Sequence, residues 1–417
     1  MAIDQENHSD VADGRVVDVT TDDTVKDVVT AKQRVAIALS GPWRLAPILI
    51  ALAVVWSFFA VKSPVFLSSV NLTNLTNQVA VSTMVALALV FVLIVRQVDL
   101  SLAMLSAVGG TMAANLSVAN HWNVILAVAT ALAFGIGVGT VQSIIVTMFR
   151  APSFIVTLGT MFILNATLLW LLPLTGEVPL AGTPLQGLAG SYLPASISYI
   201  LAAVVVLVFF ALKWTRHRAR LHEGLPSKLL RNALLPSFIL AVCLLIPLVF
   251  VFNRYLGVPT PALIVLGVCT ALSYIAFQTP LGKYIYAIGG NPEAARRAGI
   301  PVRAITIVIF AIAGCLASLA GVINASWQLG VSAQSADLTL LLSALAAVVI
   351  GGVSLFGGRG NPWSAVIGGL LVGSIQNGLD LINSSTSVQW TVEGVVLIMA
   401  VVIDAQLSRG APDPGIG

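Results

Sequence analysis

Long apolar runs separated by short polar segments fill the chain from residue 45 to residue 404. A helix needs at least about 17 apolar residues to cross the hydrocarbon core of a bilayer, and most of these runs reach or approach that length. The pattern predicts an all-α polytopic membrane protein with about 10 to 12 transmembrane helices, because the short polar turn from Arg96 to Asp99 is either a loop or a break inside the membrane. The twelve predicted helices cover residues 45–61, 79–95, 100–119, 124–148, 153–172, 197–212, 234–252, 259–278, 304–323, 338–356, 363–381 and 390–404.

The polar segments divide the chain into a central transmembrane domain, residues 45–404, and two cytoplasmic tails. Residues 1–44 carry eight acidic and five basic residues and no apolar core, so we expect a disordered tail rather than a cleaved signal peptide. Residues 405–417 form the second tail. Two polar segments interrupt the transmembrane domain, a basic loop at 213–231 and a longer loop at 279–303.

Composition and charge agree with a membrane protein. Hydrophobic residues make up 58% of the chain and charged residues only 9%, whereas soluble proteins carry roughly 25% charged residues. With a cytoplasmic N-terminus and twelve helices, only Lys62 and Arg254 of the 21 basic residues fall outside the cytoplasm. The positive-inside rule therefore predicts a multi-pass protein of the cell membrane with both termini in the cytoplasm. The basic loop at 213–231 either contacts anionic membrane lipid or serves only to fix this topology.

The stretch from residue 281 to 299 is a polar, basic segment that is marked as a short helix at both ends. Asn291 is a favoured N-cap residue, and Pro292 suits the first helical position. Glu293 in the first turn and two arginines in the last turn match the helix dipole. A helix so clearly marked outside the membrane predicts a docking element for another protein, which we call the handle. Its residues are Gly290, Asn291, Pro292, Glu293, Ala294, Ala295, Arg296, Arg297 and, as the C-terminal stop, Gly299.

A short motif occurs twice in the transmembrane domain. Residues 135–142 read GIGVGTVQ and residues 369–376 read GLLVGSIQ, and in the predicted topology the two cross the membrane in opposite directions. Inverted repeats of this kind build many transporter cores, with the substrate pathway at the repeat interface. The alternative is that G-x-x-x-G only packs two helices closely, and both interpretations can hold together.

Polar side chains at membrane depth are costly and often functional. The alternative for the amides is hydrogen bonding between helices, and for Asp99 it is a salt bridge with Arg96 or a helix N-cap. Trp327 opens a predicted outer loop, where it either stacks on a sugar or anchors the helix at the membrane surface. The candidate pathway residues are Asp99, Ser101, Gln142, Asn165, Trp327, Gln376 and Asn377.

The chain contains no motif for catalysis. No G-x-x-x-x-G-K-[ST], H-E-x-x-H or G-x-S-x-G sequence occurs, and the three cysteines show no metal-ligand spacing. We therefore expect no catalytic, cofactor or metal residue, no nucleic-acid partner, and no ATP hydrolysis by this chain.

Four runs resemble the permeases of sugar ABC importers of the ribose and xylose type, which are related to branched-chain amino acid permeases. They read VDLSLAMLSAVGG, APSFIVTLGTMFILN, LGKYIYAIGGNPEAARRAGI and VVIGGVSLFGGRGNPWSAVIGG. The basic insert after Ala211 and the run NRYLGVPTPALIVLGV look most like the xylose-type permeases, which points to D-xylose. Ribose, galactose and inositol stay open as substrates, and an ion-coupled secondary transporter is the rival class.

The resemblance implies a homodimer with two ABC ATP-binding subunits and an extracytoplasmic sugar-binding protein. The helix at Asn291 to Ala298 would then be the coupling helix seated in the ATPase, and the partner subunit would use ATP. Two places depart from the family pattern, at Arg96-Gln97-Val98 before the Asp-Leu-Ser sequence and at Ala336-Asp337.

Overall fold

The computed structural model describes residues 46–223, 229, 234–335 and 338–409. The predicted tail at 1–44, most of the second tail, the end of the basic loop and the departure at Ala336-Asp337 lie outside the described residues. The predicted domain boundaries therefore stay predictions.

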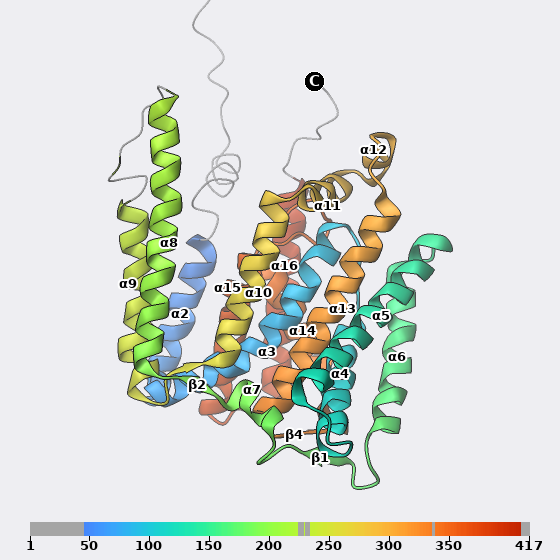
Figure 1. Ribbon diagram of the computed structural model, residues 1–417, viewed down its shortest axis with the longest axis horizontal. Coiled ribbons are helices and arrows are strands. Elements are labelled where there is room, and N and C mark those ends of the chain that lie inside the picture. The colour runs from blue at the N-terminus through green and yellow to red at the C-terminus, as the bar shows by residue number, and fades with distance from the viewer. Residues whose placement is uncertain (1–45, 224–228, 230–233, 336–337, 410–417) are drawn as a thin grey trace, which may run out of the picture. The chain divides into compact units, whose positions relative to one another are not determined.

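Helices make up nearly all of the regular structure (Figure 1). Among the described residues, eight helices are long and apolar enough to cross a membrane, and three shorter apolar helices accompany them. The helices are α2 Ala46–Lys62, α3 Ser69–Ile94, α4 Leu102–Val118, α5 Val124–Met148, α6 Ser153–Leu171, α7 Gly187–Gly190, α8 Ala195–His222, α9 Leu235–Phe250, α10 Thr260–Gln278, α11 Pro280–Gly290, α12 Pro292–Arg297, α13 Val302–Trp327, α14 Leu338–Ile350, α15 Pro362–Leu381 and α16 Thr386–Arg409.

Each of the twelve predicted apolar runs corresponds to one of these helices, so the predicted all-α polytopic class is confirmed. Four boundaries were wrong by five or more residues. Helix α3 begins at Ser69 rather than at residue 79, because its first turns carry Asn71, Thr73 and Asn77, polar residues that are buried against other helices. Helix α8 continues to His222, so the first half of the predicted basic loop is helical. Helix α14 ends at Ile350 rather than at residue 356, because Gly352 turns the chain with φ +90°, and α16 continues to Arg409 rather than ending at residue 404.

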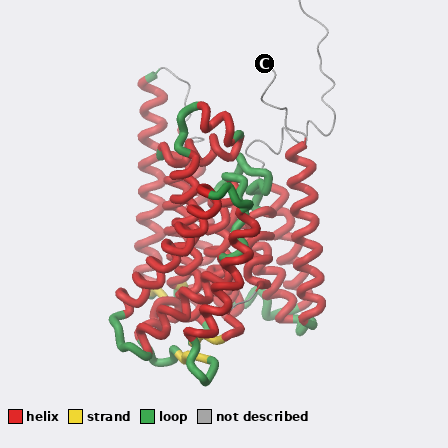
Figure 2. Tube along the Cα trace, turned by 90° about the vertical axis from the view of Figure 1, so that its right-hand side faces the viewer, coloured by secondary structure: helices red, strands yellow, loops and turns green. Residues whose placement is uncertain are grey.

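Four very short strands form two antiparallel pairs. Strand β1 (Glu177–Pro179) pairs with β4 (Gly330–Ser332), with Val178 opposite Val331, and β2 (Tyr192–Leu193) pairs with β3 (Val258–Pro259). Both pairs lie at one end of the helices (Figure 2), while α11 and α12 lie at the other end (Figure 1). The strands join the loops between α6 and α8 to the loops before α10 and α14.

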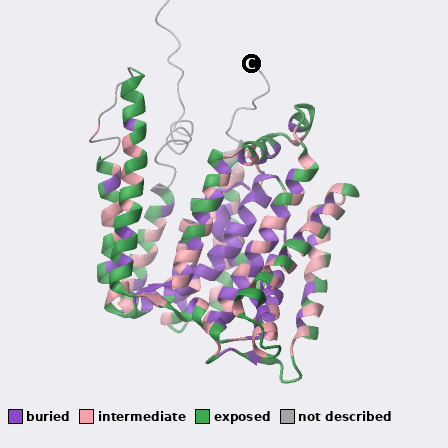
Figure 3. Cartoon of the chain, in the orientation of Figure 1, coloured by how far each residue is buried: buried purple, intermediate pink, exposed green. Residues whose placement is uncertain are grey.

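Helices α3 and α13 form the centre of the described transmembrane domain. Nearly all of α3 is buried, and two thirds of the most apolar part of α13 is buried, whereas the α8–α9 hairpin is largely exposed (Figure 3). Helix α13 packs on α3, α4 and α5, and α3 packs on α14 and α15. The long central helices therefore tie the two halves of the domain together.

The repeated motif occupies equivalent places in the two halves. Gly135 and Gly139 of α5 lie against Gly314 and the Phe310 carbonyl of α13. In the second half, Gly369 and Gly373 of α15 lie against Thr83 and Val79 of α3.

The two copies of the motif also run in opposite directions (Figure 1). Helix α5 runs toward the α12 end and α15 runs away from it (Figure 1). The motif is thus both an inverted repeat and a surface for close helix packing, as the sequence allows.

Candidate functional site

The predicted handle forms the six-residue helix α12, at one end of the helices beside α11 (Figure 1). The Oδ1 atom of Asn291 accepts hydrogen bonds from the backbone N–H groups of Glu293 and Ala294, both at 3.0 Å. Pro292 takes the first helical position, so the predicted start of the helix is confirmed.

The end of α12 is fixed equally well. Gly299 has φ +83°, a left-handed conformation that glycine adopts without steric cost. Its N–H donates to the Arg296 carbonyl, and the N–H of Ile300 donates to the Ala295 carbonyl, both at 3.0 Å. These two bonds close the helix in the manner of a Schellman motif.

One side of α12 is fixed to the protein and the other is free. Ala295 is buried in the main apolar cluster, with Ile300 packed beside that cluster. Glu293, Ala294, Arg296 and Arg297 are exposed, and the Arg296 guanidinium bonds the Glu293 carboxylate at 2.5 Å. Helix α12 therefore presents a small surface of fixed shape and mixed charge.

Three of the predicted pathway residues come together in a buried cluster at the break between α3 and α4. The Asp99 Oδ1 atom accepts hydrogen bonds from the Ser101 hydroxyl at 2.6 Å and from the Ser101 N–H at 2.9 Å. The Gln142 amide of α5 donates to the same hydroxyl at 2.7 Å. All three residues are at most 2% exposed.

Neither structural alternative for Asp99, the salt bridge with Arg96 or the helix N-cap, is formed. Its carboxylate does not pair with Arg96, whose guanidinium instead donates to the carbonyls of Gly289 and Gly290. Asp99 instead accepts from the Ser101 N–H within the break, and Ser101 is the N-cap residue of α4. Its second oxygen and the Gln142 carbonyl have no hydrogen-bond partner among the described residues.

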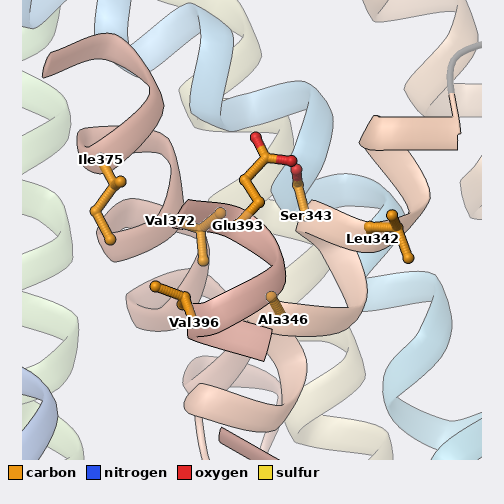
Figure 4. Close-up of a pocket in the computed structure, with 7 residues that line it drawn as sticks. All are labelled: Leu342, Ser343, Ala346, Val372, Ile375, Glu393 and Val396. Carbon is orange, nitrogen blue, oxygen red and sulfur yellow. The ribbon is translucent and has the colours of Figure 1, made fainter. Parts of the chain in front are cut away.

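A second cluster occupies the matching place in the other half. The Gln376 amide, equivalent in the repeat to Gln142, donates to the Ser343 hydroxyl of α14 and to the Glu393 carboxylate of α16, both at 2.7 Å. Figure 4 shows the side chains of Ser343 and Glu393 turned toward each other beside a small cavity lined by apolar residues. Each half thus groups a glutamine, a serine and a carboxylate: Ser101 links Gln142 to Asp99 in the first, and Gln376 bonds both partners in the second.

A groove adjoins the second cluster between α14 and α16. Its volume is about 320 Å³, and its lining includes Thr339, Trp390 and Glu393 among apolar side chains. Ser343 was missed by the sequence reasoning, because one serine in an apolar run carries no pattern. Glu393 was not among the predicted pathway residues either, although the repeated motif singled out Gln376, which donates a hydrogen bond to it.

The remaining candidates do not join these clusters. Asn377 is buried and exchanges two hydrogen bonds with Asn71 of α3, at 2.9 and 3.1 Å. Asn165 lies on the exposed face of α6, and Trp327 ends α13, half-buried against the main apolar cluster. For Asn377, the interpretation as a hydrogen bond between helices fits the geometry.

We expect Asn377→Ala to lower the stability of the protein, because it leaves the buried Oδ1 atom of Asn71 without a hydrogen-bond donor, while the Asn71 amide nitrogen keeps only the Phe66 carbonyl. Hydrogen bonds between membrane helices contribute about 0.6 kcal/mol on average and up to about 1.7 kcal/mol. A double-mutant cycle with Asn71→Ala, measured by thermal unfolding in detergent, should give a coupling free energy near the upper value for this reciprocal pair. Asn120→Ala is the matched control, because Asn120 is exposed after the end of α4, and an equal loss of stability in both variants would contradict the assignment.

Within the described residues, no group of three or more histidine, cysteine, aspartate or glutamate side chains could hold a metal ion. The capped helix, the inverted repeat and the paired polar clusters are features of a membrane transport protein.

Comparison with known proteins agrees with this class. The family model for the permease component of branched-chain amino acid transport systems matches residues 71–401. The chain therefore belongs to this family of transport permeases, and it is a transport component rather than an enzyme.

Curated relatives cover most of the chain. The xylose transport system permease protein XylH of Escherichia coli is 34% identical over 344 residues, which span 82% of this chain and 87% of the relative. The XylH protein of Haemophilus influenzae is 33% identical over 85% of this chain and 94% of its own length. The ribose import permease protein RbsC of Escherichia coli is 33% identical over 85% of this chain and 92% of its own length. No solved structure matches the chain.

Proposed function

We propose that this chain is the transmembrane permease subunit of a sugar ABC importer of the xylose and ribose type, with D-xylose as its substrate. The observation that carries the proposal is the similarity to xylose and ribose permeases over 82% and 85% of the chain. The insert after Ala211, which resembles that of the xylose-type permeases and covers the second part of α8 and the start of α9, favours D-xylose over ribose, galactose and inositol.

The energy comes from a partner subunit in this proposal. Helix α12 docks into an ABC ATP-binding subunit, which hydrolyses ATP, and an extracytoplasmic sugar-binding protein delivers the monosaccharide at the opposite end. The fixed, exposed surface of α12 supports this role, because a rigid element transmits force without losing it to local bending.

The orientation of the chain in the membrane follows from the distribution of its basic residues. Among the described residues, only Lys62 and Arg254 of the lysines and arginines lie at the end away from α12. The positive-inside rule therefore supports a cytoplasmic α12, with the start of α2 and the end of α16 on the same side.

The protein acts as a homodimer in the cell membrane. The side chain of Asn165 has no hydrogen bond within the described residues and lies on an otherwise apolar, exposed face of α6. An amide facing lipid is costly, and a second copy of the chain would cover it.

The first test is uptake of labelled sugars by cells lacking the gene, with and without the wild-type copy. We expect D-xylose uptake alone to depend on the gene. Dependence of ribose, galactose or inositol uptake instead would keep the class and replace the substrate.

The same cells separate the importer from an ion-coupled transporter. An ABC importer loses uptake when the gene for its ATP-binding subunit is deleted. Uptake that survives this deletion and stops when an ionophore collapses the ion gradients would reject the proposed class.

A further inference from the structure

Arg96 joins two parts of the protein that are far apart in the sequence. It follows the end of α3 and begins the break that carries Asp99 and Ser101. Its Nε atom donates to the Gly289 carbonyl at 2.7 Å, and its Nη2 atom donates to the Gly290 carbonyl at 2.5 Å. These carbonyls end α11, where a helix leaves its last carbonyls unpaired and favours a positive charge.

The surrounding backbone is built to hold this arginine. Arg96 has φ +63°, which is unusual for a long side chain. Gly357 leaves room for it, because a Cβ there would lie 2.3 Å from the Arg96 Cγ atom. Gly289 is equally constrained, because a Cβ there would lie 2.1 Å from the Ile94 carbonyl oxygen. Backbone from α3, α11 and the loop before α15 therefore meets around one side chain.

The contact lies on a short route between α12 and the Asp99 cluster. Only Asn291 separates the end of α11 from the start of α12, so α12 cannot move far without moving Gly290. On the other side, Arg96 precedes Asp99 by three residues. The break is also fixed to α6, because the N–H of Leu100 donates to the Thr157 hydroxyl at 3.2 Å.

We propose that Arg96 is a positioning residue that couples α12 to the break at residues 96–101. The inference rests on the proposed function, in which an ATP-binding subunit displaces α12. Displacement of α12 carries the end of α11 with it, and the guanidinium passes this movement to the break that holds Asp99, Ser101 and, through the serine hydroxyl, Gln142.

The test uses the whole transporter, isolated through a tag on this chain together with its ATP-binding subunit. The variants are Arg96→Gln and the milder Arg96→Lys. Lysine keeps the positive charge but lacks the two N–H groups with which the guanidinium donates to both carbonyls. Arg150→Gln is the matched control, since Arg150 is an exposed arginine with φ +52° in a short turn at the same end and forms no hydrogen bond within the described residues. Sugar uptake, ATP hydrolysis and hydrogen–deuterium exchange with and without ATP and vanadate are measured for each.

We expect Arg96→Gln to reduce uptake at least tenfold while ATP hydrolysis stays within about threefold of wild type, with Arg96→Lys intermediate and the control unchanged. Nucleotide should change exchange in both peptides 285–299 and 95–102 of the wild type. In Arg96→Gln, the change should persist in 285–299 and disappear in 95–102, which loss of stability alone would not produce.

Wild-type uptake by Arg96→Gln, or a nucleotide response that persists in 95–102, overturns the inference. If Arg96→Gln does not assemble, the same criteria apply to Arg96→Lys. If nucleotide does not change hydrogen–deuterium exchange in peptide 285–299 of the wild-type transporter, the proposed docking of α12 is refuted instead. The two failures are therefore distinguishable.

Discussion

Gly139→Ala is expected to disrupt the packing of α5 against α13 and to remove most of the folded protein. A Cβ at this position would lie 2.1 Å from the Phe310 carbonyl oxygen, far inside contact distance. The obstacle is helix backbone, which cannot rotate away as a side chain can, so the two helices would have to separate. We expect a cost at or above the upper end of the roughly 1–3 kcal/mol that overpacking usually causes.

The same protein offers two matched comparisons for this prediction. A Cβ at Gly373, the equivalent position in the repeat, would meet the Val79 Cγ2 atom at 2.3 Å, which a side-chain adjustment can relieve. A Cβ at Gly137, two residues from Gly139 on the same helix, would meet nothing within 4 Å. Alanine should therefore be most damaging at Gly139, milder at Gly373, and neutral or slightly stabilising at Gly137, where it favours the helix by roughly 0.5–1 kcal/mol.

Fluorescence-detected size-exclusion chromatography and thermal unfolding in detergent would rank the three variants. Equal stability of the Gly139→Ala and Gly137→Ala proteins would show that α5 and α13 leave room for a Cβ atom at Gly139.

Glu293→Ala and Arg296→Ala are each expected to reduce sugar uptake at least tenfold while the protein still inserts into the membrane. Both side chains lie on the exposed face of α12, and their mutual ion pair is more than half exposed. Such a pair contributes only about 0–1 kcal/mol to stability, and the caps at Asn291 and Gly299 remain. The loss should therefore come from the contact with the ATP-binding subunit rather than from unfolding.

Uptake, ATP hydrolysis and recovery of the ATP-binding subunit with the tagged chain would be measured for each variant. Arg303→Ala serves as the control, because Arg303 is exposed at the same end but lies on α13 outside the handle. Unchanged uptake in both α12 variants would reject the handle as the coupling element.

Several features of this protein were set by residues that are close together in the sequence. The apolar runs alone predicted a membrane protein with many helices, because crossing the bilayer requires long apolar segments. Both ends of α12 were predictable, because Asn291 and Gly299 satisfy backbone groups only two or three residues away. The repeated G-x-x-x-G motif pointed to an inverted repeat, since each copy lies within one helix.

Tertiary structure alone decided which polar residues meet. Arg96 lies beside Asp99 in the sequence, yet it bonds carbonyls 193 and 194 residues away. Asn71 pairs with Asn377 across 306 residues, and Gln376 finds Ser343 and Glu393 on two different helices. A polar side chain in an apolar interior takes whatever partner the packing of helices brings within reach, because leaving it unpaired is costly. That packing depends on the whole arrangement of α3, α13 and the helices around them, which no local pattern contains.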